Sequence, residues 1–388
     1  MKISILKESL CIGGTERSAA NISLALSKNH IVKTVLYDGS DICYPYGGEL
    51  LDMRLPARAS KVGKLFNSVR RAYAYKKHIK EFKPDVVFQF LSFRSPVGAL
   101  RLKEGIKIVS ARDFSALSNN IAGYKKRLDE STAMICNSEY LRDYFVDRYP
   151  EDRERVFTVN NIINADNIKA QSEEEIDEEF INFREKYDYI IVSTGRFCKE
   201  KAFEKLILSF SKVHKVMPST GLVLIGDGDY KEKYVKVSEV NGISDAIYYT
   251  GYQKNPYKYM ANCDVFVLSS LSEGFPNVLA EAMALSMPVI AINCYTGPAE
   301  ILMKNYNYKV VKESFLECDY GILTPHYDIK GTDWAINEMA KAIIHVLKDN
   351  TTMEKYRNLS AKRVLDFSAE VAVRNLEIIF NDLINKNK

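Results

Sequence analysis

The sequence predicts an α/β protein made of two consecutive halves, each with a parallel β-sheet covered by helices on both faces. Three observations support this prediction. Short apolar runs alternate with helical patterns along the chain, and that alternation is typical of parallel sheets. The pattern stops at an acidic run, 173–179, and then starts again. The chain has 388 residues, which is too long for one ordinary hydrophobic core.

In the first half, strands are predicted at 3–6, 32–37, 85–90, 107–111, 133–138 and 156–162. The first strand is followed by Gly13-Gly14 and a helix over about 15–27. A glycine pair before a helix lets the backbone approach a phosphate. A simple tight turn is the alternative interpretation of this pair.

In the second half, strands are predicted at 189–194, 221–225, 246–252, 265–268 and 288–292, with a last helix over about 369–385. The acidic run between the halves is interpreted as a solvated helix or linker. The two halves therefore look like Rossmann-like domains in tandem.

The composition excludes several classes of protein. The chain is 46% hydrophobic and 27% charged, which is globular rather than disordered. Its net charge of +4 is too small to indicate a nucleic-acid partner. Seven scattered cysteines without a Cys-x-x-Cys pair favour a reducing compartment. There is no apolar run of 18 residues and no signal-peptide pattern, so we expect a cytoplasmic protein.

One segment, 263–284, combines a strand, a glycine loop and a helix. The apolar run 265–268 is typical of a buried strand, and helical spacing begins after Pro276. Proline suits the first turn of a helix. The free N–H groups and the dipole at such a helix start favour an anion. Glu273 in the loop and Glu281 in the helix are expected to flank that anion.

The run from Glu273 to Ala284, Glu-Gly-Phe-Pro-Asn-Val-Leu-Ala-Glu-Ala-Met-Ala, resembles glycosyltransferase family 4 and its retaining Glu-x7-Glu signature. The resemblance implies the GT-B fold, in which two Rossmann-like domains have parallel sheets that face a deep interdomain cleft. It also implies that the C-terminal helix crosses back to the first domain. We expect an acceptor-side domain over 1–170 with 368–388, and a nucleotide-sugar-binding domain over 186–367.

A second motif follows the first strand of the second half. The loop 195–202 carries Arg196 and Lys201, and an arginine fork with a lysine charge suits a diphosphate. The family typically has Gly-Arg-x-x-x-x-Lys-Gly, so Ala202 departs from the pattern. Two solvated surface charges are the alternative interpretation.

The resemblance implies a donor site and a reaction. Arg196, Lys201, the backbone at Gly14 and the helix start after Phe275 would meet the charge that develops on the leaving diphosphate. Glu281 would bind the ribose, and Glu273 would orient the transferred sugar. Many relatives have a histidine in the first domain, but Arg112-Asp113 stands here, and Asp113 is the acceptor-side candidate. The catalytic candidates are Glu273, Arg196, Lys201 and Asp113, and the donor-binding candidates are Gly14, Arg196, Lys201, Gly226, Asp227, Gly274, Phe275, Pro276, Asn277 and Glu281.

Asp227-Gly228-Asp229 has the Asp-x-Asp spacing that binds a divalent cation in the other large glycosyltransferase fold. Here it lies in a glycine turn after a strand and resembles the family 4 turn beside the nucleotide. Arg196 and Lys201 already supply positive charge. We therefore expect no metal and no cofactor.

The predicted function is retaining transfer of a hexose from a nucleotide sugar to a lipid-linked saccharide acceptor, in cell-surface polysaccharide synthesis. The segment 296–302 resembles family members that use UDP-hexoses, which favours UDP-Gal, UDP-GalNAc or UDP-Glc. Two alternatives remain open: a catalytically silent binding partner, and another GT-B enzyme such as a sugar-nucleotide epimerase.

The stretch 61–83 is predicted to be a basic amphipathic helix. It has eight basic residues against one acid, Glu81, and apolar residues at three-to-four spacing. Such a helix suits an anionic membrane surface. The alternative is that its apolar side chains pack on the first sheet. We expect peripheral association with the inner face of the cell membrane.

Overall fold

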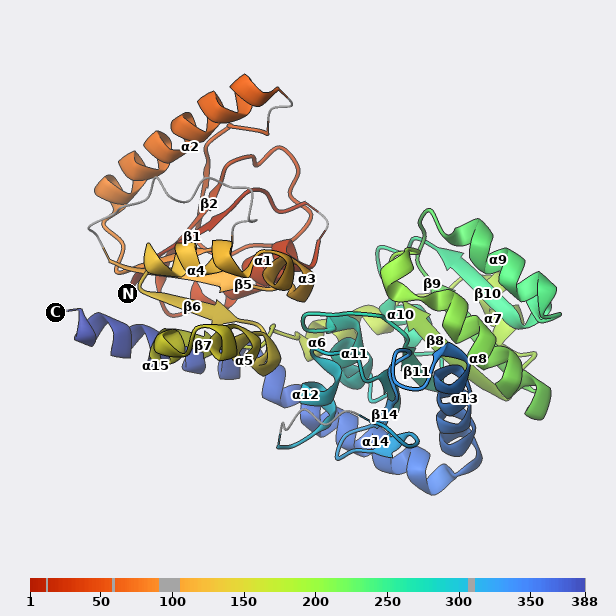
Figure 1. The fold of residues 1–388 in the computed structure, drawn as a ribbon. Helices are drawn as coiled ribbons and strands as arrows, with labels where there is room; N and C mark the ends of the chain where they lie inside the picture. The colour runs from red at the N-terminus through yellow and green to blue at the C-terminus, as the bar shows by residue number, and fades with distance from the viewer. Residues whose placement is uncertain (12, 58–59, 91–104, 306–310, 388) are drawn as a thin grey trace. The chain divides into compact units, whose positions relative to one another are not determined.

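The computed structural model describes residues 1–11, 13–57, 60–90, 105–305 and 311–387, and it divides into two compact units (Figure 1). Unit 1 comprises Met1–Ile162 and Ala369–Lys388, and unit 2 comprises Ile163–Ser368. The fold is α/β with two Rossmann-like units, as predicted. The expected functional domain limits, 1–170 and 186–367, stay a prediction.

The described part of unit 1 contains a parallel sheet in the order β3-β2-β1-β4-β5-β6-β7. Alternate residues of its central strands enter opposite cores, since Ile5 packs in one cluster and Leu6 in another. The strands are β1 (Lys2–Lys7), β2 (Ile31–Leu36), β3 (Glu49–Asp52), β4 (Val86–Gln89), β5 (Ile106–Ala111), β6 (Ala133–Cys136) and β7 (Val156–Thr158).

Helices cover both faces of this sheet. On one face, α1 (Gly14–Leu26) packs with α15 (Ala369–Lys386) around Leu26 and Phe380. The C-terminal helix therefore belongs to unit 1, as predicted. On the other face lie α2 (Lys61–Phe82), α4 (Ile121–Asp129) and α5 (Glu139–Arg148). Ser138 caps α5 by accepting a hydrogen bond from the Leu141 N–H, which is the cap expected from the sequence.

Unit 2 repeats the plan in its described residues, with the strand order β10-β9-β8-β11-β12-β14-β13. The strands that the sequence predicted in this half pair in parallel, as expected, whereas β13, which it did not predict, pairs antiparallel with β14. The two strands are joined by a short turn in which Cys318 N–H donates to the Gly321 carbonyl, and so short a connection allows only antiparallel pairing. The strands are β8 (Tyr189–Thr194), β9 (Thr220–Ile225), β10 (Ile247–Gly251), β11 (Val265–Leu268), β12 (Val289–Ile292), β13 (Leu316–Glu317) and β14 (Ile322–Thr324).

Two hydrophobic clusters fill the two faces of the second sheet. One contains Leu279 and Met283 of α11 (Asn277–Ala284), and the other contains Phe210 of α8 (Phe203–Val216) and Ile343 of α13 (Thr332–Lys348). The acidic run, which the sequence places between the two halves, lies within unit 2, where residues 173–177 join α6 (Ala165–Ser172) to α7 (Glu178–Arg184). Its acidic side chains are exposed, as predicted. The other helices of this unit are α6 (Ala165–Ser172), α7 (Glu178–Arg184), α9 (Lys231–Val240), α10 (Tyr257–Met260), α12 (Pro298–Leu302) and α14 (Asn350–Arg363).

Candidate functional site

The predicted donor-binding residues of unit 2 lie in loops at one edge of its sheet, except Asn277 and Glu281, which lie in the following helix α11. Strands β8, β9, β11 and β12 are parallel, so their carboxyl ends share that edge, where open α/β sheets bind ligands. The loop after β8 holds Arg196 and Lys201, the loop after β9 holds Gly226 and Asp227, and the loop after β11 holds Glu273.

Lys201 and Glu273 form an ion pair at this edge. Lys201 Nζ lies 2.7 Å from Glu273 Oε1, and both side chains are mostly buried. Burial opposes the charge of Lys201, but the carboxylate of Glu273 outweighs this effect and raises the pKa of Lys201 above its usual value. Lys201 is therefore positively charged at neutral pH. Arg196 is exposed.

The loops after β8 and β9 pack closely because two glycines permit it. Phe197 N–H donates to the Asp227 carbonyl over 2.8 Å. Gly226 has φ +144°, and a side chain there would meet the carbonyl oxygen of Gly195 at 2.0 Å. A Cβ at Gly228 would meet the Phe197 carbonyl oxygen at 2.5 Å. The backbone next to Arg196 is thus fixed by its contact with the 226–228 turn.

The loop after β11 ends where α11 begins. Pro276 occupies the cap position of this helix, one residue before the first turn in which it was expected. The Phe275 ring packs edge-on against Phe367 in the core, 5.2 Å between ring centroids, so only the backbone of Phe275 remains for a ligand. Glu281 is buried within α11, with 2% of its surface exposed.

A fourth loop, after β12, packs against the start of α11. Gly297 has φ +84°, and a Cβ there would lie 2.3 Å from Pro276 Cδ. The start of α12 is therefore held against the start of α11. The segment 296–302, which the sequence singled out, borders the predicted donor loop in space.

Sequence reasoning missed several polar residues at this edge. Each of these residues stands at the end of a core strand or just beyond it, and its side chain is almost fully buried. Polar residues at the ends of parallel strands are the signal that could have found them. They are Ser269, Ser270, Asn293 and Thr324.

In unit 1, the predicted residues have local partners. Gly14 is the first residue of α1, but the carboxylate of Glu16 folds back over Gly13 and pairs with Lys7 Nζ at 2.9 Å. A carboxylate thus already lies at the positive end of α1. Asp113 caps α3 (Phe114–Asn119) by accepting a hydrogen bond from Ala116 N–H over 2.6 Å. The donor role of Gly14 and the acceptor role of Asp113 stay predictions.

The chain matches two family models. Residues 12–167 match Glycosyltransferase Family 4, and residues 174–318 match Glycosyl transferases group 1. Together these matches cover more than half of the sequence and include the loops described above. The chain belongs to glycosyltransferase family 4.

Individual relatives agree with this assignment. An uncharacterized glycosyltransferase of Methanocaldococcus jannaschii, MJ1059, is 27% identical over 82% of this chain and 84% of its own length. The N-acetylgalactosamine-N,N'-diacetylbacillosaminyl-diphospho-undecaprenol 4-alpha-N-acetylgalactosaminyltransferase of Campylobacter jejuni is 23% identical over 94% of this chain and 95% of its own. The crystal structure of Anabaena Alr3699/HepE in complex with UDP and glucose has a TM-score of 0.72 at 16% identity, covering 98% of this chain and all of that one. The predicted GT-B fold is therefore confirmed.

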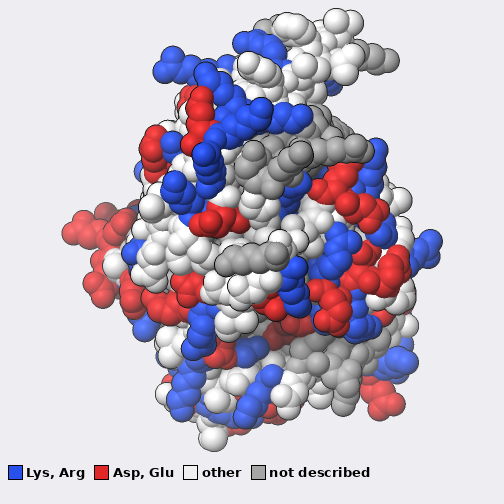
Figure 2. Space-filling model, turned by 90° about the vertical axis from the view of Figure 1, so that its left-hand side faces the viewer, with Lys and Arg blue, Asp and Glu red and all other residues white. Residues whose placement is uncertain are grey.

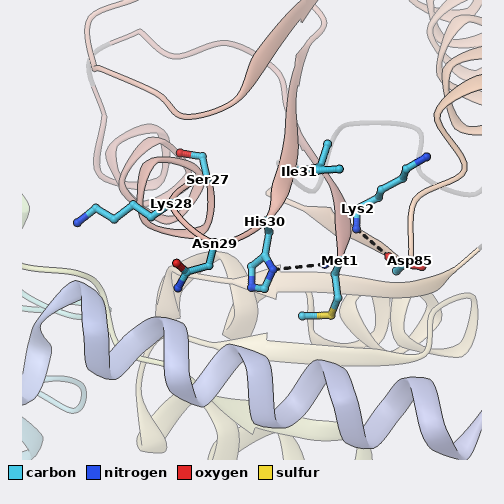
Figure 3. A pocket seen from close by; sticks show the side chains of 8 residues that line it. All are labelled: Met1, Lys2, Ser27, Lys28, Asn29, His30, Ile31 and Asp85. Atoms are coloured by element: carbon cyan, nitrogen blue, oxygen red, sulfur yellow. Dashed lines mark hydrogen bonds between the residues drawn. The ribbon is translucent and has the colours of Figure 1, made fainter.

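This family 4 glycosyltransferase also has two open pockets outside the predicted site. One, of about 590 Å³, lies at the amino ends of β1 and β2. There the terminal amine of Met1 donates a hydrogen bond to His30 Nδ1 (Figure 3). The other, of about 720 Å³, lies between Met303 and Lys355 in unit 2. Neither pocket is lined by a residue predicted for donor binding.

Among the residues that the structure describes, no group of three or more His, Cys, Asp or Glu side chains is able to hold a metal ion. Asp227 Oδ1 instead accepts a hydrogen bond from Gly228 N–H over 2.8 Å. Independence from metal stays a prediction for this glycosyltransferase. Within the same residues, no helix is both long and apolar enough to cross a membrane.

Proposed function

We propose that this glycosyltransferase transfers a hexose from a UDP-linked donor to a lipid-linked saccharide, with retention of configuration at the anomeric carbon. The observation that carries the proposal is the Lys201–Glu273 pair at the carboxyl edge of the unit 2 sheet. It joins the two motifs that were identified separately in the sequence.

Each residue of the pair has a part in the proposed reaction. Lys201 and the exposed Arg196 stabilise negative charge on the leaving diphosphate, and such fixed charges act most strongly where water is excluded. Glu273 keeps Lys201 charged and accepts hydrogen bonds from hydroxyl groups of the transferred sugar. The acceptor hydroxyl attacks from the side of the leaving diphosphate, whose oxygen takes the proton, so no protein nucleophile is required.

The donor and acceptor classes are supported by related proteins. Alr3699/HepE was crystallised with UDP and glucose, which supports a UDP-hexose donor. The relative from C. jejuni is named for transfer to a saccharide on diphospho-undecaprenol, which supports a lipid-linked acceptor and a role in cell-surface saccharide synthesis.

Helix α2 supports a membrane location for that acceptor. The apolar side chains in the first half of α2 are largely exposed and do not pack on the sheet, since Val62, Leu65 and Val69 are 80%, 71% and 63% exposed. The sheet instead contacts the opposite face of α2 through Tyr75 and Ile79. Figure 2 shows Lys and Arg side chains beside uncharged ones at the top of the molecule, where α2 lies. We propose that α2 docks on an anionic membrane at its cytoplasmic face.

One basic residue of α2 is excluded from this surface. Arg71 donates two hydrogen bonds to the Leu55 carbonyl, over 2.9 and 2.6 Å, and its guanidinium lies over the ring of Tyr37. The exposed basic residues are Lys64, Arg70, Lys76, Lys77, Lys80 and Lys83. The proposed docking surface is this set together with the exposed apolar side chains.

The proposal is tested by offering labelled UDP-, GDP- and ADP-hexoses to the purified chain with a membrane extract. Label from a UDP-hexose should enter the lipid fraction with the wild type, and it should enter about a hundredfold more slowly with Lys201→Ala. Transfer from a GDP- or ADP-sugar alone would contradict the donor assignment. Binding of UDP without any transfer would instead favour a catalytically silent partner.

A further inference from the structure

The carboxyl edge of the unit 1 sheet holds a set of buried polar atoms without partners. Within the part of the chain that the structure describes, no hydrogen-bond partner is present for Gln89 Oε1, Arg112 Nη2, Asn137 Oδ1 or Thr158 Oγ1. These residues end, or directly follow, β4, β5, β6 and β7. Native proteins leave few buried polar atoms unpaired, so four along one edge indicate a place for a polar ligand.

Arg112 is the charged member of this set. Only 8% of its surface is exposed. Its Nε donates to Ser110 Oγ over 2.6 Å, and its Nη1 donates to Asn161 Oδ1 over 3.1 Å. Its guanidinium lies over the ring of Phe90, 5.2 Å from the ring centre. All of these contacts are with neutral groups.

The positive charge of Arg112 is therefore not compensated by the described residues. Burial lowers its pKa to about 10, so the guanidinium still carries its charge at neutral pH. A buried charge without a counter-charge destabilises the fold. Lys7 at the same edge differs, because its Nζ is paired with Glu8 at 2.8 Å and Glu16 at 2.9 Å.

We propose that Arg112 binds a phosphoryl group of a substrate, which supplies the missing counter-charge. A guanidinium presents planar paired donors that match phosphate oxygens. The unpaired amide oxygens of Gln89 and Asn137, at the same edge of the sheet, suit hydroxyl groups of an attached sugar. The anion site follows from unit 1 alone, and it rests on the proposed function only for the source of the phosphoryl group, which is a diphosphate-linked acceptor or the donor.

The first test measures binding of inorganic pyrophosphate to the full-length chain by the rise in melting temperature. The parent is the Arg196→Ala/Lys201→Ala variant, because its proposed diphosphate site in unit 2 is disabled. Pyrophosphate should still raise the melting temperature of this double variant in a saturable way, and by more than sodium chloride of equal ionic strength does. Adding Arg112→Gln should weaken pyrophosphate binding at least about tenfold, since a charge-assisted pair is lost.

Arg142→Gln is the matched control. It removes the same charge from unit 1, but Arg142 already lies beside Glu139 and Asp143, 3.5 and 3.1 Å away, so pyrophosphate binding should not change. A parent without a saturable rise, or an Arg112→Gln variant that binds as its parent does, would overturn the proposal. If Arg112→Gln does not fold, Arg112→Lys replaces it. That variant keeps the charge but loses the planar donors, and unaltered affinity would again count against the proposal.

The second test identifies the source of the phosphoryl group. Arg112→Gln is made in the otherwise wild-type chain, and transfer is measured to a farnesyl-diphosphate-linked sugar and to the benzyl glycoside of the same sugar. If the acceptor supplies the phosphoryl group, Arg112→Gln should raise the KM only for the diphosphate-linked acceptor. If the donor supplies it, the variant should raise the KM for the nucleotide sugar with both acceptors. Equal loss of kcat with both acceptors and unchanged KM values would mean that Arg112 has only a structural role. Absence of transfer by the wild type would refute the proposed function and leave the pyrophosphate test to decide the anion site.

Discussion

Lys201 and Glu273 are separated by 72 positions in the sequence, yet Lys201 Nζ lies 2.7 Å from Glu273 Oε1. Backbone contacts hold the two loops together. Ser269 Oγ donates to the Lys201 carbonyl, and Leu271 N–H donates to the Glu200 carbonyl, each over 2.8 Å. The lysine charge is thus fixed in place before any ligand arrives, which is the condition under which a charge stabilises a transition state most effectively.

Replacing either basic residue of the donor loop should slow transfer. We expect Lys201→Ala and Arg196→Ala each to lower kcat by about a hundredfold, because under the proposed function each removes a charge that stabilises the leaving diphosphate. Initial-rate measurements with saturating donor give this value. Lys212→Ala is the control, since Lys212 is an exposed lysine on α8. Near-wild-type rates for both variants of the donor loop would refute the diphosphate assignment.

The ion pair should also contribute to stability with a defined pH dependence. Because the pKa of Lys201 is raised in the folded state above 10.5, the protonated form favours folding. The contribution of the ion pair to the unfolding free energy is fully present below pH 10.5, and it is lost as the pH rises through the pKa of Lys201 in the folded state. The difference in unfolding free energy between wild type and Lys201→Met should therefore shrink at higher pH. Urea unfolding across that range measures it, and a difference that grows with pH would contradict the pairing.

The close contact between Gly297, in the loop after β12, and Pro276, after β11, predicts a large effect of a single added methyl group. Gly297→Ala should destabilise the chain by at least about 3 kcal/mol, because left-handed strain adds to overlap with Pro276. Gly242→Ala is the control. Gly242 also has positive φ, +66°, but open space surrounds the added carbon, so the loss should be only about 1–2 kcal/mol. Equal losses in thermal unfolding would show that the contact with Pro276 is unimportant.

The docking surface on α2 is tested by sedimentation with vesicles. Leu65→Ser/Phe66→Ser/Val69→Ser should weaken binding without lowering stability, because all three side chains are exposed. Replacing Arg70, Lys76, Lys77 and Lys80 by serine should reduce affinity for anionic vesicles by about fivefold per residue. The control is Val240→Ser, an exposed valine in unit 2. Equal binding to neutral and anionic vesicles, unaffected by these changes, would rule out the proposed docking.

The sequence was informative where local pattern and tertiary structure agree. The apolar run 189–194 predicted β8 to the residue, because buried parallel strands are continuously apolar. The sequence pattern did not indicate β3, because residues Glu49–Asp52 form only a short edge strand with an exposed end. Pairing with β2 defines that strand, and pairing cannot be deduced from four residues.

The candidate site shows the same division. The motifs located Arg196, Lys201 and Glu273, because family resemblance is carried by local runs of residues. They did not predict the ion pair or the capping role of Asp113, since both depend on how loops meet. Arg112 was overlooked for the same reason. An arginine after a strand suggests a surface loop, and only the structure shows it buried beside Phe90.

The most direct test of the central proposal is the configuration of the first product. The purified chain is supplied with an α-linked UDP-hexose and its acceptor, and the configuration of the new glycosidic bond is determined by proton NMR. Retention predicts an α linkage, which Lys201→Ala should form about a hundredfold more slowly than the wild type. A β linkage formed by the wild type would contradict the retaining mechanism.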